Sequence, residues 1–196
     1  MKFNEDILLL FEDMLKKHHQ IYRIPVKAEA WEDLADQVIN KEKSNFIPFN
    51  HSTGHDLNFE LEKSNFSSQL KTGTIKDNKL IFSSHRLGRF ETLEEKIEFL
   101  DNVNYDSFLF LSRNDSEIWD KNYFIYYIDK KITNYTSLKW KEIIGKKGKY
   151  KNRISGWEGV SEDGKIKCKI TKSMSHQLWV EIDLSLINFV KKITIC

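Results

Sequence analysis

One short stretch of the chain combines residue types that could hydrolyse a phosphodiester. Asp56 is followed, after about a dozen residues, by Gln69 and Lys71. Mg²⁺ prefers oxygen ligands such as carboxylate and amide groups, and it lowers the pKa of a bound water and polarises a phosphate. A nearby lysine would position the attacking water and stabilise the charge that develops. These three residues predict a metal-dependent catalytic site.

Two alternating runs of residues, 55–61 and 66–73, flank a polar turn and predict a β-hairpin that carries this site. Side chains alternate between the two faces of a strand, so Gln69 and Lys71 must point in the same direction. A hairpin that buries its apolar face would bring Asp56 near both of them.

The pattern Gly54-His55-Asp56 followed by Gln69-Leu70-Lys71 resembles the active-site motif of the PD-(D/E)xK nuclease superfamily, which includes most type II restriction endonucleases. Histidine stands where proline is commonest, and glutamine replaces the second acid, as it does in some members. The resemblance implies that Asp56, Gln69 and Lys71 are catalytic and that Asp56 and Gln69 bind the metal.

In this superfamily the helix before the catalytic sheet often lends a glutamate to the metal. By that resemblance Glu29 or Glu32 could supply the charge that is missing at Gln69. The alternative is that both are ordinary surface acids near a helix N-terminus.

A second stretch, Ser83 to Lys96, resembles a pattern in some bacterial type II restriction enzymes. It predicts DNA contacts from hydroxyl, imidazole and guanidinium groups, because arginine reads guanine and also binds phosphate; these residues are Ser83, Ser84, His85, Arg86 and Arg89. The alternative is a helix-entry loop in which one arginine pairs with Glu91 or Glu94.

Two later segments could also meet DNA. The segment 139–153, which is rich in lysine and glycine, is interpreted as a mobile loop that contacts phosphates or is merely solvated. Ser173, Ser175 and Gln177 would share one face if their stretch is extended, and could then bond base edges. They could equally be polar residues of an edge strand.

Periodicity and capping signals predict helices over residues 4–20, 26–41 and 92–100. Strands are expected at 80–82, 107–111, 123–128, 165–171 and 177–183, in addition to the hairpin. This order matches the αβββαβ core of the PD-(D/E)xK fold. We expect an α/β (α+β) protein with that restriction-endonuclease-like core, a mixed central sheet flanked by helices, and a β-rich C-terminal extension.

The chain of 196 residues is long enough for one domain with a sizeable core. Within it we expect a catalytic core at about 25–130 and a DNA-recognition or dimer extension at about 131–196. The net charge of +2 permits nucleic-acid binding without requiring it. No apolar run could span a membrane and no signal peptide is apparent, and two cysteines are interpreted as reduced thiols of a cytoplasmic protein.

Histidines at two places could suggest metal binding. His51 and His55 lack the cysteine pairs and the nearby third and fourth ligands of a zinc site. His18 and His19 are interpreted as the solvated end of the first helix.

The leading hypothesis is a type II restriction endonuclease that cuts double-stranded DNA at a short site with Mg²⁺, for which Mn²⁺ can substitute. Cutting both strands needs two active sites, so a homodimer is expected, with a cognate DNA methyltransferase encoded separately. The alternatives are a structure-specific repair or resolvase-type nuclease of the same fold, and a non-catalytic DNA-binding module.

Overall fold

The structure is a computed structural model that describes residues 3, 5–39, 57–61, 64–116 and 119–195. Asp56, His51 and His55 lie outside the described residues. The chain divides into two compact units. Unit 1 comprises residues 1–75, 104–130 and 187–196, and unit 2 comprises residues 76–103 and 131–186. The break between residues 130 and 131 coincides with the predicted start of the C-terminal extension, although residues 76–103 group with that extension.

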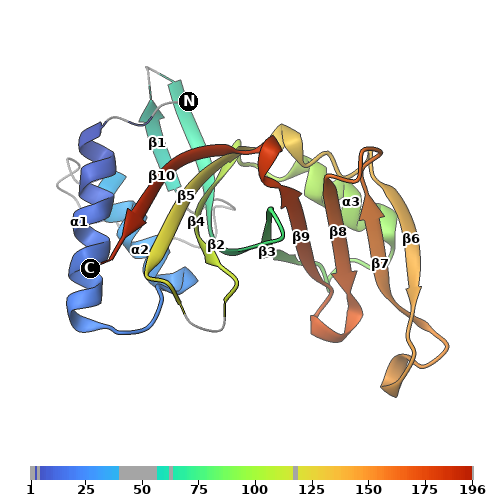
Figure 1. The fold of residues 1–196 in the computed structure, drawn as a ribbon. Coiled ribbons are helices and arrows are strands. Elements are labelled where there is room, and N and C mark those ends of the chain that lie inside the picture. Colours follow the sequence, from blue (N-terminus) through green and yellow to red (C-terminus); the bar gives the residue numbers. More distant parts are fainter. Residues whose placement is uncertain (1–2, 4, 40–56, 62–63, 117–118, 196) are drawn as a thin grey trace. The chain divides into compact units, whose positions relative to one another are not determined.

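Unit 1 packs two helices against a mixed sheet (Figure 1). The helices are α1 (Glu5–Ile21) and α2 (Ala28–Ile39). The sheet has the order β10-β5-β4-β2, and β1 pairs with the first part of β2. The strands are β1 (Leu57–Leu61), β2 (Ser64–Lys76), β4 (Ser107–Asn114), β5 (Asn122–Asp129) and β10 (Asn188–Thr194).

The pairing within unit 1 confirms the predicted hairpin and shows a parallel contact. β1 runs antiparallel to β2, with Leu57 opposite Ser68. β2 runs parallel to β4 from Ser68 opposite Ser107 to Ile75 opposite Asn114. A parallel pair needs a crossover connection. Here the chain between the two strands contains β3 (Lys79–Arg86) and α3 (Leu93–Asn102).

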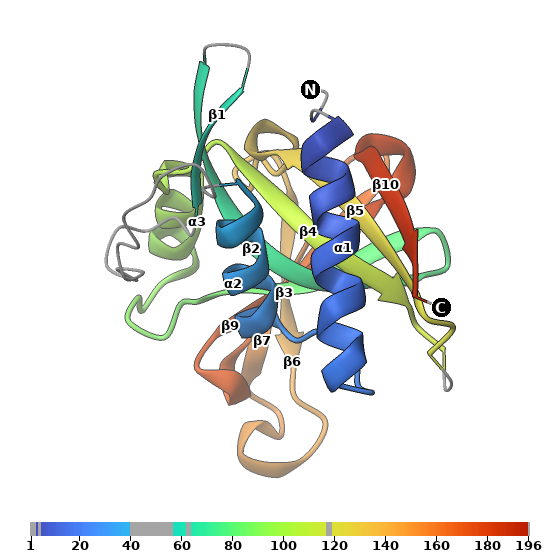
Figure 2. The same ribbon diagram turned by 90° about the vertical axis from the view of Figure 1, so that its left-hand side faces the viewer.

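The core of unit 1 lies between its helices and one face of its sheet (Figure 2). The rings of Phe11 and Trp31 pack at a tilt of 35°, with centroids 5.3 Å apart. The indole Nε1 of Trp31 donates a hydrogen bond to the carbonyl oxygen of Leu109 at 3.3 Å. Leu70 of β2 belongs to the same apolar cluster. This packing fixes which face of β2 is turned toward the helices.

β4 is the buried strand that its continuous apolar run predicted. Phe108, Leu109 and Phe110 are completely buried, and the strand lies between β2 and β5. A strand that is covered on both faces loses the polar and apolar alternation of a half-exposed one. The prediction of a doubly covered strand at 107–111 is confirmed.

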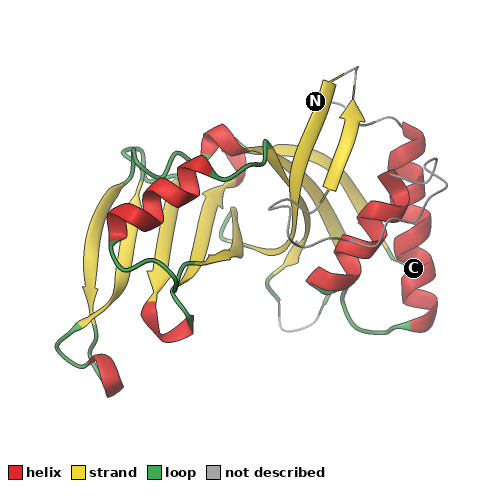
Figure 3. Cartoon of the chain, turned by 180° about the vertical axis from the view of Figure 1, so that it is seen from behind, coloured by secondary structure: helices red, strands yellow, loops and turns green. Residues whose placement is uncertain are grey.

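Unit 2 consists of an antiparallel sheet and one helix (Figure 3). The sheet order is β3-β9-β8-β7-β6. Its other strands are β6 (Lys139–Ile144), β7 (Ile154–Val160), β8 (Ile166–Thr171) and β9 (Gln177–Asp183). Thr92 and Glu95 form the predicted capping box at the start of α3, each side chain bonding the other residue's backbone N–H.

The basic segment after residue 139 is more regular than the sequence suggested. Residues 139–144 form β6, and the loop that follows is closed by backbone hydrogen bonds, including Gly145 N to Arg153 O at 2.9 Å and Asn152 N to Gly145 O at 2.9 Å. The expectation of a loop is therefore wrong for residues 139–144, which form a strand. The alternation of Trp140 and Glu142 with lysines was the available signal, and the surrounding charges obscured it.

Within the described residues the chain is thus a mixed α/β protein with three α-helices and ten strands. No helix in the described ranges is long and apolar enough to cross a membrane. The strands β6, β7 and β10 and the early start of β2 were not predicted from the sequence.

Candidate functional site

Gln69 and Lys71 lie on the face of β2 that is turned away from the helices. Leu70, between them, packs into the helix-side core, and the pairing of β2 with β4 is regular, so the alternation of a strand sends both neighbours to the other face. Gln69 is opposite Phe108, and Lys71 is opposite Phe110. The expectation that Gln69 and Lys71 point the same way is confirmed.

The residues of β4 beside these two polar side chains are aromatic and buried. Phe108 and Phe110 are fully buried, Gln69 is 7% exposed, and Lys71 is half-buried. Interactions between charges are stronger in such an environment than in water. A lysine held here would act strongly on any anion that reaches the same face.

Asp106 is a carboxylate on this face that the sequence reasoning missed. Its Oδ2 accepts hydrogen bonds from the backbone N and from the Oγ of Ser67, each at 3.0 Å. Ser67 is two residues before Gln69, so it shares the face of Gln69 and Lys71. The position of Asp106, immediately before the buried run 107–111, was the only signal in the sequence.

Asp56, the predicted anionic ligand, lies outside the described residues. The described strand β1 begins at the next residue, Leu57, whose partner on β2 is Ser68. Among the described residues no group of three or more His, Cys, Asp or Glu side chains converges to hold a metal. A metal at this face would need oxygen ligands such as Gln69 and Asp56 together, with water.

Glu29 and Glu32 lie on α2, which packs on the other side of the sheet. Trp31, between them in sequence, bonds the backbone of β4 from the helix side. Glu29 is exposed and Glu32 is half-buried. The sheet therefore separates α2 from the face that carries Gln69 and Lys71, and the structure does not bring the glutamates together with those residues.

Unit 2 brings together two of the three segments that were predicted to contact DNA. We call residues 83–90 and 172–177 the loop pair. β3 pairs with β9, so that Arg86 is opposite Gln177. Leu87 N donates to His176 O at 3.1 Å, and a Cβ on Gly88 would come within 3.1 Å of the Ser175 carbonyl oxygen. Segments that are about ninety residues apart in sequence form one surface.

Only part of the loop pair faces solvent. The exposed residues among those predicted to bind DNA are Ser83, Arg86, Arg89, Ser173 and Ser175. Ser84 is half-buried, and its Oγ is buried with no hydrogen-bond partner within the described part of the chain. The imidazole of His85 packs edge-on against Phe99 at 5.6 Å.

The two arginines do not form the ion pairs that the alternative reading required. The Arg89 guanidinium lies 4.8 Å from the ring centroid of Phe90 and 4.5 Å from that of Phe99. Neither Arg86 nor Arg89 makes a salt bridge to any carboxylate in the ranges that the structure describes. Both charges are therefore available to an external anion.

The buried side chain of Gln177 links the two segments of the loop pair through hydrogen bonds. Its Nε2 donates to the carbonyl oxygens of Ser84 at 2.8 Å and His85 at 3.3 Å, and the residue is 8% exposed. The stretch before it is not extended, because Lys172–Met174 form a 3₁₀ turn and Ser175 and His176 have φ of 53° and 54°. The condition under which Ser173, Ser175 and Gln177 would share one face is therefore not met.

A buried lysine supports this surface and was not singled out by the sequence reasoning. Lys96 of α3 is completely buried, and its Nζ donates to the carbonyl oxygens of Phe90 and Thr92. The same Nζ lies 5.3 Å from the ring centroid of Trp157, and Lys172 Nζ lies 4.8 Å from it. Burial lowers the pKa of Lys96. The spacing of Lys96 from Leu93 and Leu100 already places it on the apolar face of the helix.

No protein-family model and no curated protein matches this chain.

Proposed function

We propose that this protein is a Mg²⁺-dependent endonuclease of the type II restriction class, built on a restriction-endonuclease-like αβββαβ core, that cuts double-stranded DNA at a short site. The observation that supports the proposal most is the pairing of β1 with β2. β1 begins directly after Asp56, its first residue is opposite Ser68, and Gln69 and Lys71 follow on that same strand. The parallel contact between β2 and β4, with β3 and α3 between them in sequence, suits such a core.

In this proposal, residues of the chain bind the metal, orient the attacking water and stabilise the charge on the phosphate. Asp56 and the amide oxygen of Gln69 would hold the metal, which supplies an activated water and polarises the phosphate. Lys71 would donate hydrogen bonds to the attacking water and to a phosphate oxygen. The aromatic side chains of Phe108 and Phe110 would strengthen these interactions by excluding water.

The loop pair is the part of unit 2 that we assign to the DNA. Arg86 and Arg89 would meet phosphate or guanine, and the exposed hydroxyls of Ser83, Ser173 and Ser175 would meet phosphate or base edges. Cleavage of both DNA strands requires two active sites, so a homodimer with two-fold symmetry is part of the proposal. A separately encoded methyltransferase would protect the host DNA.

The decisive experiment is incubation of the purified protein with phage DNA and Mg²⁺, with products resolved on a gel. Discrete bands support a restriction enzyme. A smear would indicate a nuclease without sequence specificity, and intact DNA that is nevertheless bound would indicate a DNA-binding module. Mn²⁺ in place of Mg²⁺ is expected to sustain cleavage.

Two substitutions test the assigned site. Asp56→Ala and Lys71→Met should each abolish cleavage and leave DNA binding largely intact. Lys76→Met is the matched control, because Lys76 is exposed at the end of the same strand. Wild-type turnover of either site variant, or equal loss in the control, would refute the assignment.

Two further variants ask which carboxylate compensates for the neutral Gln69. Asp106→Asn should reduce cleavage if the carboxylate on the Gln69 face takes part, and Glu32→Gln should not, because α2 lies across the sheet. Loss of cleavage in Glu32→Gln, with normal cleavage in Asp106→Asn, would indicate that the glutamate of α2 belongs to the site.

A further inference from the structure

The loop between β6 and β7 concentrates positive charge. We call residues 145–153 the basic tip. It contains no aspartate or glutamate, and its five exposed cations are Lys146, Lys147, Lys149, Lys151 and Arg153. None of them forms a salt bridge in the ranges that the structure describes. The basic tip therefore carries charge that no carboxylate of its own segment offsets.

Other residues hold the shape of the basic tip. Its backbone is closed by hydrogen bonds from Gly145 N to Arg153 O and from Asn152 N to Gly145 O, each at 2.9 Å. A Cβ on Gly145 would come within 2.2 Å of the Tyr150 carbonyl oxygen, and Gly148 has a φ of +66°, which favours glycine. The lysine side chains make none of these contacts. Their mutual repulsion destabilises the loop, and a bound polyanion would relieve it.

The basic tip and the loop pair emerge from the same end of the unit 2 sheet. Paired residues form one row across β3, β9, β8, β7 and β6, in the order Arg86, Gln177, Thr171, Gly156 and Ile143. Figure 1 shows the β6–β7 and β8–β9 connections at this end. Neighbouring strands are about 4.8 Å apart, so the row is about 19 Å wide, more than the roughly 12 Å of a DNA major groove. The two surfaces together can reach phosphates on both sides of a groove.

Cations far outnumber acids at this end of unit 2. The basic tip and the loop pair together contain eight lysine and arginine residues and no aspartate or glutamate. Three glutamates follow the loop pair near the start of α3 and interact electrostatically with the buried Lys96; they are Glu91, Glu94 and Glu95. The whole chain has 31 lysine and arginine residues and 29 acidic ones, so its charges are strongly segregated here.

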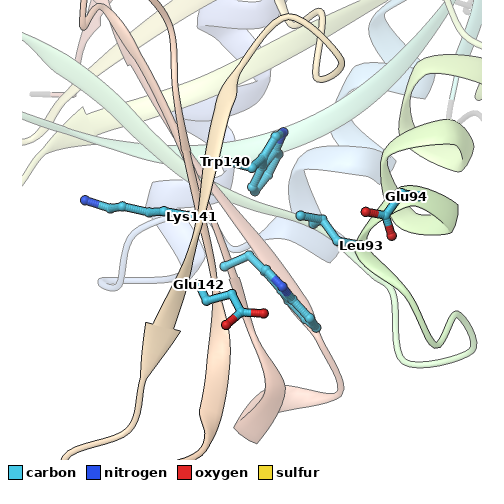
Figure 4. Close-up of a pocket in the computed structure, with 6 residues that line it drawn as sticks. Leu93, Glu94, Trp140, Lys141 and Glu142 are labelled. Atoms are coloured by element: carbon cyan, nitrogen blue, oxygen red, sulfur yellow. The ribbon is translucent and has the colours of Figure 1, made fainter.

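The two acids of the β6–β7 hairpin lie outside the basic tip. Glu158 of β7 pairs with Lys141 at 2.7 Å and with Lys167 at 2.9 Å. Glu142 of β6 lines the cavity of unit 2 together with Trp140. Figure 4 shows Glu142 and Lys141 projecting from opposite sides of the strand. Within this hairpin, Glu142 is thus the one carboxylate left to oppose the five cations of the basic tip.

We propose that the basic tip, together with the loop pair, binds the phosphate backbone of double-stranded DNA and that the basic tip supplies affinity that does not depend on sequence. DNA carries one negative charge per about 1.7 Å of its axis, a density that suits a cluster of exposed cations. The choice of DNA as the ligand rests on the proposed function, but this binding needs neither metal nor cleavage.

An anionic membrane surface is the competing partner for a basic loop. Segments that lie on a membrane also bury an apolar face in it. Beside the basic tip and in the loop pair, the described residues expose two large apolar side chains, Ile144 and Met174. This is a small apolar area, and the arginines and hydroxyl groups of the loop pair suit phosphate and base edges better.

The test measures the affinity of the protein for a random-sequence duplex at several potassium chloride concentrations, in EDTA to prevent metal-dependent cleavage. The tip variant replaces all five cations of the basic tip with glutamine. Each phosphate contact that is lost reduces the slope of log affinity against log salt by about 0.9, so three to five contacts predict a reduction of about 2.7–4.5. Affinity should fall alike for A/T-rich and G/C-rich duplexes.

The control variant replaces five other exposed cations with glutamine, again four lysines and one arginine: Arg23, Lys27, Lys121, Lys165 and Lys192. It changes the net charge equally, and its slope should change by less than about one. Lys147→Gln alone should reduce the slope by about one, which keeps the test valid if the fivefold variant is poorly folded. Thermal denaturation checks the fold of each variant.

The inference is overturned if the tip variant and Lys147→Gln keep the wild-type slope or if the control variant loses as much as the tip variant. It is also overturned if vesicles of anionic phospholipid bind the protein more tightly than the duplex does at the same salt concentration. Cleavage with Mg²⁺ is a separate readout. Cleavage by a protein whose basic tip leaves the slope unchanged refutes this inference alone, whereas the expected slopes without any cleavage refute the nuclease alone.

Discussion

Gln69 illustrates how burial determines the chemistry of a single residue. The side chain is 7% exposed and lies beside Phe108, where a carboxylate would lose its hydration without regaining it. Burying an amide costs far less than burying an unpaired charge. The amide at this position therefore suits its buried surroundings.

Gln69→Glu should lower the free energy of unfolding by about 1–3 kcal/mol when divalent metal is absent, because it buries a carboxylate. Mg²⁺ should restore part of this loss if the new carboxylate binds the metal. Urea denaturation in EDTA and in Mg²⁺ measures both effects, with Gln37→Glu on the exposed side of α2 as the control. A variant as stable as the wild type in EDTA would contradict this account of the position.

Lys96 is the second residue whose role depends on its surroundings. Replacing it with methionine keeps the hydrophobic stem but removes the donor that bonds the carbonyl oxygens of Phe90 and Thr92. We expect Lys96→Met to lower the free energy of unfolding by about 1–3 kcal/mol. Urea denaturation measures the change, and Lys169→Met on the exposed side of β8 serves as the control. A gain in stability would mean that desolvation of the ammonium outweighs its hydrogen bonds.

At the scale of elements, a tyrosine of β5 forms hydrogen bonds at both ends of the connection between α1 and α2. The Tyr123 hydroxyl accepts a hydrogen bond from Val26 N at 2.8 Å and lies 2.9 Å from His19 Nε2. His19 Nδ1 lies 2.9 Å from the carbonyl oxygen of Tyr22, which can only accept. Nδ1 therefore carries the proton and Nε2 accepts from Tyr123. The interpretation of His19 as merely solvated was wrong, because its partner is more than a hundred residues away in sequence.

Tyr123→Phe should lower the free energy of unfolding by about 1–3 kcal/mol, because it leaves the buried Val26 N–H without its acceptor. Tyr126→Phe on the same strand is the matched control, since the Tyr126 hydroxyl makes no hydrogen bond within the described ranges. Thermal and urea denaturation compare the two variants. Equal effects would mean that the Tyr123 hydroxyl does not stabilise the connection between α1 and α2.

At the scale of the whole molecule, the lowered pKa values of three histidines and one glutamate make the fold sensitive to acid. Burial is the main cause that lowers the pKa values of His18, His19 and His176 below 6.5. Hydrogen bonds from Lys16 and Lys191 lower the pKa of Glu12 from 4.5 to about 2. In all four cases the unfolded chain binds more protons than the native one as the pH falls, so stability rises with pH.

The free energy of unfolding should therefore be greatest above pH 6.5 and should fall as the pH drops below it, as the histidines become protonated. A second loss should follow as the pH falls from 4.5 toward 2, where the Glu12 contribution disappears. Urea denaturation across this range tests the sign. His19→Gln should flatten the upper part of the profile, and stability that increased on acidification would contradict the argument.

The division into two units also belongs to this scale. The sequence suggested one break near residue 130, and the structure groups residues 76–103 with the later strands. β3 pairs with β9, which is about a hundred residues further along the chain. Local patterns cannot reveal such a pairing, because it depends on contacts that no short window contains.

The features that could be predicted from the sequence alone are local. The period of two along β2 set the common direction of Gln69 and Lys71, the capping box set the start of α3, and an unbroken apolar run identified β4 as buried. Each of these patterns spans only a few residues, and the geometry of the local backbone relates it directly to a strand or a helix. Helix bounds were therefore predicted closely.

Contacts between residues that are distant in sequence became apparent from the folded structure. It paired Ser67 with Asp106, joined the loop pair through Gln177, and set Trp140 against Gly159 at the cavity of unit 2. It also separated α2 from the face of Lys71. These contacts depend on the order of strands in the sheet and on which face of the sheet the helices cover. The free energy that favours this arrangement comes from the burial of apolar surface over the whole core, which no short stretch of sequence contains.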